Sequence, residues 1–150
     1  MSYLIDTSAI INIVQQKGGD AIALLRDQYT LDIAFYESGN AIRTLYHRND
    51  LDRTEALELA SDIAGVWMTM RVVSYSPLDM NAMLDMAMDL DIAFYDAAFL
   101  FQAKQLNIPI VTDDKPFQKK IPGTIKWIDS TELNEIKTHD VDDALQPKQY

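Results

Sequence analysis

"DAAFLFQAKQLNIPIVTDD", residues 96–114, is the stretch that decides the fold. Its first part, residues 96–106, is typical of a helix, which "NIP" closes. The apolar run "IPIVT" at 108–112 then predicts a short buried strand that ends at two acids, Asp113 and Asp114. A helix that leads into a buried strand is characteristic of an α/β fold.

The same alternation continues along the rest of the chain. Apolar runs predict further strands, at residues 3–5, 31–35, 71–75 and 124–128. Helical spacing predicts the helices between them, at 7–14, 20–28, 37–47, 52–70 and 77–88. Thr7 or Ser8 would cap the first helix, and Ser76 followed by Pro77 marks the start of the last. Alternating short strands and helices predict a parallel sheet covered on both faces.

Length and tail composition set the expected domain boundaries. The 150 residues are enough for about one domain, and 48% of them are hydrophobic, which supplies a real core. We therefore expect one α/β domain over residues 1–136, with a central parallel sheet of four or five strands flanked by helices. Residues 137–150 are polar, and we expect them to form a mobile tail.

Composition also excludes several classes of site. The chain has no cysteine, which rules out disulfides, thiolate zinc sites and cysteine nucleophiles. A net charge of −10 argues against a nonspecific nucleic-acid binder with a basic face. It does not argue against acids collected at a metal site, because the bound cation would offset their charge.

Nothing in the sequence predicts a membrane segment. The N-terminus "MSYLIDTSAIINIV" has neither the basic region nor the long apolar run of a signal peptide. No uninterrupted apolar stretch approaches the roughly 18 residues of a transmembrane helix. We therefore expect a soluble, cytoplasmic protein with no membrane partner.

One short sequence occurs twice, as "LDIAFYE" at 31–37 and "LDIAFYD" at 90–96. The flanking residues of the two copies share almost nothing, so the chain does not contain a duplicated unit. We expect the first copy to be a strand and the second a link between helices. Each places an acid in the first turn of the following helix, with Tyr36 and Tyr95 packed beside it.

Four acids occupy equivalent positions in this scheme: Asp6, Glu37, Asp96 and Asp114. Each alone has a structural explanation, because acids are common in the first turn of a helix. In a parallel sheet, however, the carboxyl ends of the strands meet at one edge, where ligands bind. Four carboxylates gathered there would repel one another unless a hard divalent cation neutralised them. Oxygen ligands without Cys or a nearby His favour Mg²⁺ or Mn²⁺, which can promote phosphodiester hydrolysis.

The sequence also resembles a known family in the segments "LIDTSAII", "YESGNAI" and "YDAAFLFQAKQLNIPIVTDDKPF". These are similar to the PIN-domain ribonucleases, and especially to the VapC-type toxins of toxin–antitoxin pairs. The resemblance extends from about residue 2 to residue 129. It implies a Mg²⁺- or Mn²⁺-dependent endoribonuclease that cuts RNA, pairs with an antitoxin protein and forms a homodimer.

The resemblance also implies roles for individual residues. The family's acidic quartet, which binds the metal and carries the catalysis, falls on Asp6, Glu37, Asp96 and Asp114. Five further residues are expected to support the site: Thr7, Ser8, Asn40, Thr112 and Asp113. Thr7 or Ser8 and Thr112 would orient it, and Asn40 lies where a polar helper is often found. Asp113 could join the metal ligands, although the family's T-x-D spacing favours Asp114.

A dimer has a separate basis in the sequence. The helix at 77–88 carries several methionines, which offer an adaptable apolar surface. One small domain need not cover this surface fully, so we expect the helix to contribute to a homodimer interface.

Two other functions remain open from the sequence. The first is a magnesium-dependent phosphatase or phosphotransfer domain. A haloacid-dehalogenase-type phosphatase, however, would need a second Asp two residues after Asp6, where this chain has Ser8. The second is a partner-binding module without catalysis, whose acids are only helix caps. Stabilisation by Mg²⁺ would distinguish a clustered site from scattered caps.

Overall fold

The computed structural model describes residues 1–145, with the backbone alone for residues 142, 143 and 145. Its strands form one sheet and are two or three residues long: β1 (Leu4–Ile5), β2 (Tyr29–Leu31), β3 (Arg71–Val73), β4 (Ile110–Val111) and β5 (Trp127–Ile128). All the pairings are parallel, in the order β3-β2-β1-β4-β5. The predicted parallel sheet is therefore confirmed, with five strands.

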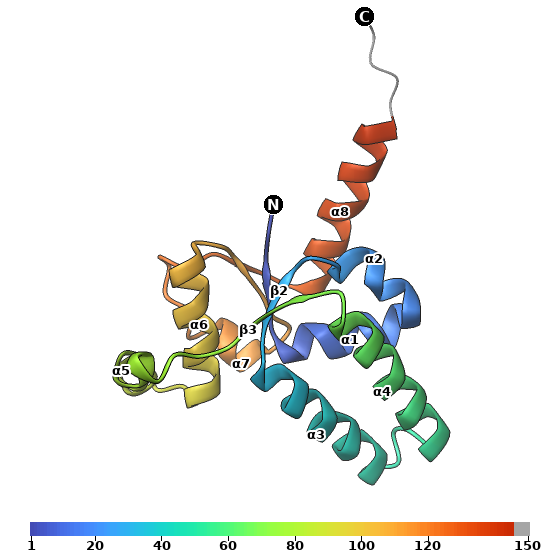
Figure 1. Cartoon of the computed structure of the whole chain (residues 1–150), viewed down its shortest axis with the longest axis horizontal. Coiled ribbons are helices and arrows are strands. Elements are labelled where there is room, and N and C mark those ends of the chain that lie inside the picture. Colours follow the sequence, from blue (N-terminus) through green and yellow to red (C-terminus); the bar gives the residue numbers. More distant parts are fainter. Residues whose placement is uncertain (146–150) are drawn as a thin grey trace, which may run out of the picture.

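Helices cover this sheet on both sides. They are α1 (Thr7–Lys17), α2 (Ala21–Leu25), α3 (Ile33–His47), α4 (Arg53–Trp67), α5 (Met80–Leu90), α6 (Phe94–Leu106), α7 (Lys115–Gln118) and α8 (Ser130–Leu145). Two short 3₁₀ turns, η1 (Gly18–Asp20) and η2 (Pro77–Asp79), precede α2 and α5. Helices α1 to α4 pack on one another, and α5 pairs with α6 on the other side of the strands (Figure 1). No helix within residues 1–145 is both long and apolar enough to cross a membrane.

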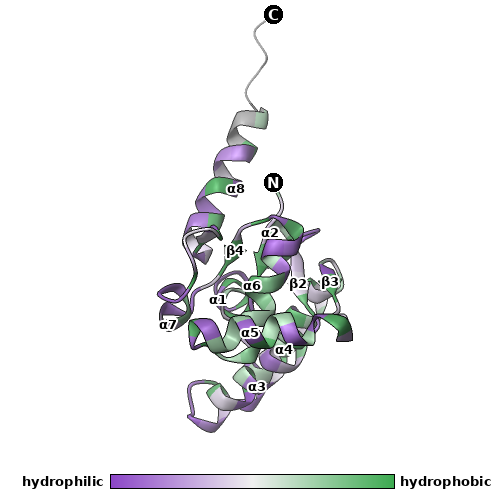
Figure 2. Cartoon of the chain, turned by 90° about the vertical axis from the view of Figure 1, so that its left-hand side faces the viewer, coloured by the Kyte–Doolittle hydropathy of each residue, from purple (hydrophilic) through white to green (hydrophobic). Residues whose placement is uncertain are grey.

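The core lies around the central strand β1 and its neighbour β4. Leu4 and Ile5 of β1 and Ile110 and Val111 of β4 are completely buried. Hydrophobic residues are concentrated around β4 and α6, whereas α7 and the far end of α3 are hydrophilic (Figure 2). β1 and β4 are continuous apolar runs, as the sequence predicts for a buried parallel sheet, whereas the edge strands β3 and β5 are exposed or only partly buried.

The strand order fixes where a ligand can enter. From β1 the chain adds β2 and β3 on one side, then crosses to add β4 and β5 on the other. The order of strands therefore reverses between β1 and β4, and the crevice at their carboxyl ends is the usual ligand site in such sheets.

Two local predictions were wrong. The strand predicted over 31–35 keeps only Leu31, because α3 already begins at Ile33. Glu37 is consequently the fifth residue of α3, one turn beyond the helix start at which the sequence predicts it. The cap of α1 is Asp6 itself, whose carboxylate accepts from the Ala9 N–H, and not Thr7 or Ser8. An aspartate with an extended backbone is as good an N-cap as either hydroxyl residue.

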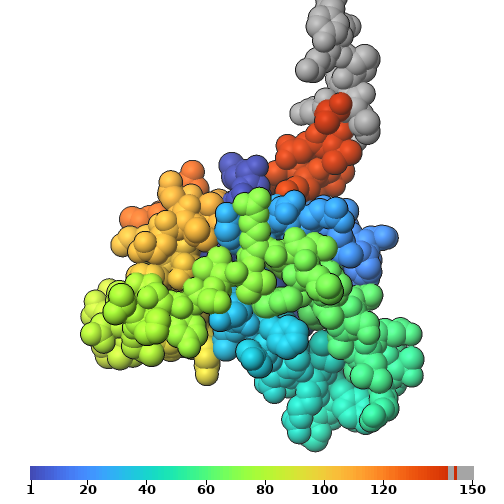
Figure 3. All heavy atoms as spheres, viewed as in Figure 1, coloured from blue at the N-terminus to red at the C-terminus, as the bar shows by residue number. Residues whose placement is uncertain are grey.

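The C-terminal region differs in part from the prediction. Helix α8 runs without a break from Ser130 to Leu145, across the boundary predicted at residue 136. Leu133 anchors the start of α8 in the core, and the helix then leaves the body of the molecule (Figure 3). Residues 146–150 of the predicted tail lie outside the described residues, and the tail's mobility and the domain boundary stay predictions.

Candidate active site at the ends of β1 and β4

Asp6 stands where β1 and β4 end. Its backbone N–H donates to the Val111 carbonyl at 3.0 Å, which extends the pairing of these strands by one step. Because the chain turns into α1 immediately after Asp6, the side chain is fixed at the mouth of the crevice between the two strands. The position follows directly from the sequence, in which an apolar run stops at an acid.

The Asp6 carboxylate is buried, with 6% of the residue exposed, and is held by short hydrogen bonds. Oδ1 accepts from the Ser8 hydroxyl at 2.7 Å and from the Ala9 N–H at 2.9 Å. Burial raises the pKa of Asp6 to about 7; the Thr112, Ser8 and Ala9 donors oppose this rise, and the negative charge of Asp113 adds to it. Loss of water around a carboxylate therefore outweighs three hydrogen-bond donors.

Glu37 reaches the same region from α3. The Thr7 hydroxyl donates to Glu37 Oε1 at 2.8 Å and so joins the first turn of α1 to the second turn of α3. Burial raises the pKa of the half-buried Glu37, and this hydrogen bond lowers it. The predicted orienting role of Thr7 thus has a specific contact, with Glu37.

Asp96 and Asp114 enter from the other side of the sheet. Asp96 is the third residue of α6 and is half-buried, whereas Asp114 caps α7 by accepting from the Phe117 N–H at 3.0 Å. Burial raises the pKa of Asp96 to about 6, with the negative charges of Asp114 and Glu37 adding to the rise. Asp114 and Glu37 therefore both lie within electrostatic reach of Asp96.

Among the described residues, no lysine, arginine or histidine forms an ion pair with these four acids. Within residues 1–145 the one ion pair joins Lys120 Nζ to Asp91 Oδ2, 3.8 Å apart and exposed on the surface. No three acid or histidine side chains in the same part of the chain stand close enough to hold a metal ion as they are placed. All four candidate side chains are nevertheless carboxylates, and such hard oxygen donors fit the chemistry of Mg²⁺ or Mn²⁺.

The sequence alone made Asp113 a possible further metal ligand, but both of its carboxylate oxygens accept hydrogen bonds from other residues. Its Oδ2 accepts from Asn12 Nδ2 at 2.9 Å, and its Oδ1 accepts from the Ser130 backbone N–H at 2.8 Å. The Asp113 N–H donates to the Ser8 hydroxyl at 2.9 Å. The sequence analysis did not predict the roles of Asn12 and Ser130. Only Asn12 could have been noticed, because it is a polar residue in the otherwise buried run "IINIV", one turn after Ser8.

The remaining predicted residues divide into two groups. Thr112 is completely buried, and its hydroxyl accepts from the Asp114 N–H at 3.2 Å and lies 3.4 Å from the Ser8 hydroxyl, so it belongs to the site's framework. Asn40 is exposed on α3, one turn after Glu37, and its carbonyl accepts from the Thr44 hydroxyl. The role of Asn40 stays a prediction.

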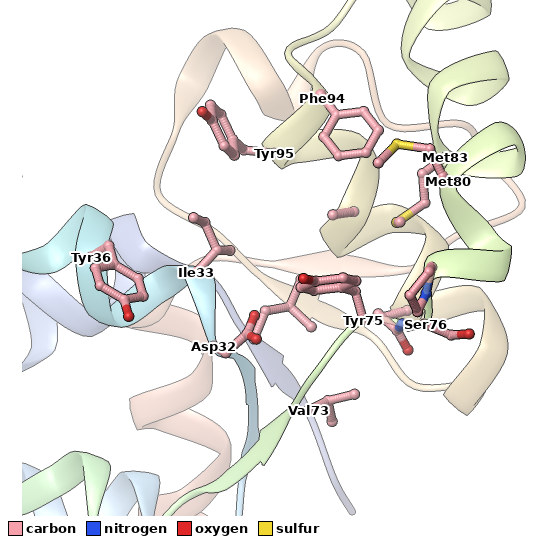
Figure 4. Close-up of a pocket in the computed structure, with 14 residues that line it drawn as sticks. Asp32, Ile33, Tyr36, Val73, Tyr75, Ser76, Met80, Met83, Phe94 and Tyr95 are labelled. Atoms are coloured by element: carbon pink, nitrogen blue, oxygen red, sulfur yellow. The ribbon is translucent and has the colours of Figure 1, made fainter.

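An apolar groove of about 310 Å³ adjoins the acids. Met80 and Met83 of α5 point into it, and Tyr36 and Tyr95 flank it from α3 and α6 (Figure 4). The two tyrosines directly precede Glu37 and Asp96, and they are 73% and 54% exposed. The prediction that they are packed was wrong: each lies on a helix surface that neighbouring elements leave open.

Comparisons with known proteins agree with this architecture. No protein-family model matches the chain. Two curated proteins of Pyrobaculum aerophilum align with it over 130 residues, which is 83% of this chain. Ribonuclease VapC3 is 24% identical, over 98% of its own length, and Exonuclease VapC9 is 26% identical, over 90%.

A solved structure of the same organism, PAE2754, superposes with a TM-score of 0.74 at 24% identity. The superposition covers 93% of this chain and 96% of that one, so the likeness extends over the whole domain. The chain is thus a distant homologue of the VapC ribonucleases and has the α/β fold of a PIN domain.

Proposed function

We propose that this protein is a divalent-metal-dependent endoribonuclease that hydrolyses RNA phosphodiester bonds. One observation carries the proposal: Asp114 and Glu37 lie within electrostatic reach of Asp96, the buried Asp6 ends β1, and none of these four acids has a cationic partner in the described residues. Proteins keep such uncompensated charge chiefly where a cation binds. Similarity to proteins named as a ribonuclease and an exonuclease supports a nuclease reaction.

Asp6, Glu37, Asp96 and Asp114 would hold Mg²⁺ or Mn²⁺. When bound, the cation would activate a water as nucleophile and stabilise the charge that develops on the phosphate. Asp6 would supply the fixed ligand, because the Ser8 and Ala9 donors hold its Oδ1 in place. Thr7 positions Glu37 in the same way. Asp6 and Asp96 must lose their protons before they can bind, so activity rises with pH through about 6 to 7.

We further propose that the protein is the toxin of a toxin–antitoxin pair, that it acts in the cytoplasm and that it forms a homodimer. The 77–88 segment supports the dimer, because Leu78 is 92% exposed and Met88 is 67% exposed. Together with the groove lined by Met80 and Met83, these side chains form an apolar surface of the kind that proteins bury in an interface.

Cleavage of RNA tests the proposed reaction. Wild type, Asp6→Asn and Asp96→Asn are compared with Mg²⁺, with Mn²⁺ and with chelator, on one RNA in linear and circular form. We expect wild type to cut both forms with metal, and both variants to lose at least about 100-fold in rate. The surface variant Asp91→Asn is the matched control and should retain wild-type activity, because the Asp91 side chain is exposed and pairs with Lys120 on the surface.

Each outcome points to a different function. Cutting of the linear RNA alone would indicate an exonuclease, since a circle has no end. Equal cutting in chelator, or full activity of both folded site variants, would contradict the metal-dependent reaction. Absence of cleavage together with no stabilisation by Mg²⁺ would favour the partner-binding module.

A further inference from the structure

Asp113 connects three parts of the molecule that are distant in the sequence. It follows β4, its Oδ2 accepts from Asn12 in α1, and its Oδ1 accepts from the Ser130 N–H at the start of α8. Both partners donate, so each carboxylate oxygen of Asp113 accepts one hydrogen bond. The residue is half-buried between these elements.

Asp113 is linked to Asp6 through the Ser8 hydroxyl. The Ser8 hydroxyl has a single proton, which it donates to Asp6 Oδ1 at 2.7 Å. Its oxygen accepts from the Asp113 N–H at 2.9 Å. The direction of the Ser8 proton is therefore determined from both sides, and the placement of the Asp113 backbone determines where Ser8 holds the Asp6 carboxylate.

We propose that Asp113 is a positioning residue for Asp6, acting through Ser8, and not a ligand of the metal; this inference rests on the proposed function. Asn12 and the N-terminus of α8 hold the Asp113 side chain, and Asp113 in turn fixes the Ser8 hydroxyl. A ligand placed by a hydrogen-bonded neighbour binds metal more tightly than one that must be ordered on binding.

Two substitutions separate positioning from ligation. Asp113→Asn removes the charge but can keep both bonds. The oxygen of the substituted amide accepts from the Ser130 N–H, and its nitrogen donates to the Asn12 side chain once that side chain's amide rotates by half a turn. Asp113→Ala removes both bonds. If Asp113 positions Asp6, the Asn variant should bind Mn²⁺ within about threefold of wild type and the Ala variant about 10–100-fold more weakly.

Asn12→Ala tests the same contact from outside the acidic cluster. It removes one of the two side-chain bonds of Asp113 and should weaken Mn²⁺ binding by an intermediate factor. Asp52→Ala is the matched control, because the Asp52 side chain caps the start of α4 by accepting from the Glu55 N–H at 2.9 Å and bonds to none of Asp113, Asn12 and Ser130. It should leave Mn²⁺ affinity unchanged while lowering the melting temperature of the metal-free protein.

The experiment measures Mn²⁺ affinity by titration calorimetry, metal-free melting, and kcat and KM for RNA on each variant. We expect kcat at subsaturating Mn²⁺ to follow Mn²⁺ affinity, with KM unchanged. Weakening by Asp113→Asn equal to that by Asp113→Ala would make Asp113 a ligand and overturn the inference. If the variants melt at a lower temperature but bind Mn²⁺ like wild type, Asp113 only stabilises the fold, and this result also overturns the inference. If the wild type itself neither binds Mn²⁺ nor cuts RNA, the proposed function fails, and the inference fails with it.

Discussion

The two copies of "LDIAFY", residues 31–36 and 90–95, have the same sequence but different backbones. In the first, Leu31 ends β2 and Asp32 is already helical, with φ of −57°. In the second, Leu90 ends α5 and Asp91 takes a left-handed conformation, with φ of 51°, before α6 begins. Pairing of Leu31 with β3 fixes the first copy, whereas the end of a helix fixes the second. Six residues therefore adopt the conformation that their neighbours impose.

The acid after the six shared residues is also used differently in the two copies. The Glu37 carboxylate is held by the Thr7 hydroxyl. The Asp96 carboxylate is half-buried beside the charges of Asp114 and Glu37 and accepts no hydrogen bond within residues 1–145. The first copy thus presents an oriented acid and the second an acid under repulsion. The second should be the more sensitive to a cation.

The largest expected difference between the copies is in catalysis. Asp96→Asn should lower kcat for RNA cleavage at least about 100-fold, because the amide cannot bind the metal as strongly as a carboxylate. Glu37→Gln should cost about 10-fold, since the Gln oxygen can still accept from Thr7. Asp32 and Asp91 are the second residues of the two copies and provide matched controls. Asp32→Asn and Asp91→Asn should both keep wild-type rates. Equal losses from Asp91→Asn and Asp96→Asn would contradict the assignment.

A smaller effect is expected on the stability of the metal-free protein. The pKa of Asp96 is about 6 in the folded protein, so folding favours its protonated form. The free energy of unfolding should therefore fall as pH rises from about 4 to about 6, by about 1–2 kcal/mol after allowance for solvent screening. Asp6 extends the fall to about pH 7. Urea unfolding across this range should show the slope, and Asp96→Asn should flatten its lower part. An unchanged slope would mean that burial and the neighbouring charges do not raise the pKa of Asp96 in the folded protein.

The tyrosines of the two copies lead to a third prediction, about the groove between them. If the apolar surface beside Tyr36 and Tyr95 is a dimer interface, Leu78→Asp should weaken the dimer at least about tenfold by burying a charge. Met68→Asp, at an 86% exposed position after α4, is the control and should have no effect. Sedimentation at micromolar concentration measures both, and a monomeric wild type would count against the dimer.

The smallest effect should have opposite signs in the two copies. Asp91→Gly should stabilise the protein by about 0.5–1 kcal/mol, because glycine takes a left-handed backbone without strain. Asp32→Gly should destabilise it by a similar amount, since its backbone is helical and glycine loses more entropy there. Thermal melting of both variants is sufficient, and two shifts of the same sign would contradict the backbone comparison.

The sequence could predict the parts of the fold in which apolar runs end at an acid. Asp6 and Asp114 follow β1 and β4 closely, and the parallel sheet was predicted from this pattern. The start of α3 could not be predicted, because "LDIAF" suits a strand and a helix equally well and only the pairing of Leu31 with β3 decides between them. Helix α8 was not predicted, because its apolar residues are too sparse to show a period.

The site was predictable as a set of residue types and not as a set of contacts. Acids after strands indicated which side chains could meet, since parallel strands end at a common edge. No sequence pattern indicated that Asp113 would turn toward Ser130, 17 residues further on, because that contact depends on where α8 starts in space. The exposure of Tyr36 and Tyr95 could not be predicted for the same reason, because it depends on which elements pack against α3 and α6.

The most direct test of the metal site is a Mn²⁺ titration followed by calorimetry and by melting. Wild type and Asp91→Asn should bind Mn²⁺ and melt at a temperature that rises with its concentration, since the ion binds only the folded protein. Asp6→Asn and Asp96→Asn should bind far more weakly and show little rise, while their metal-free forms remain folded. Equal Mn²⁺ binding by all four proteins, or no binding by wild type, would contradict a metal site built from these acids.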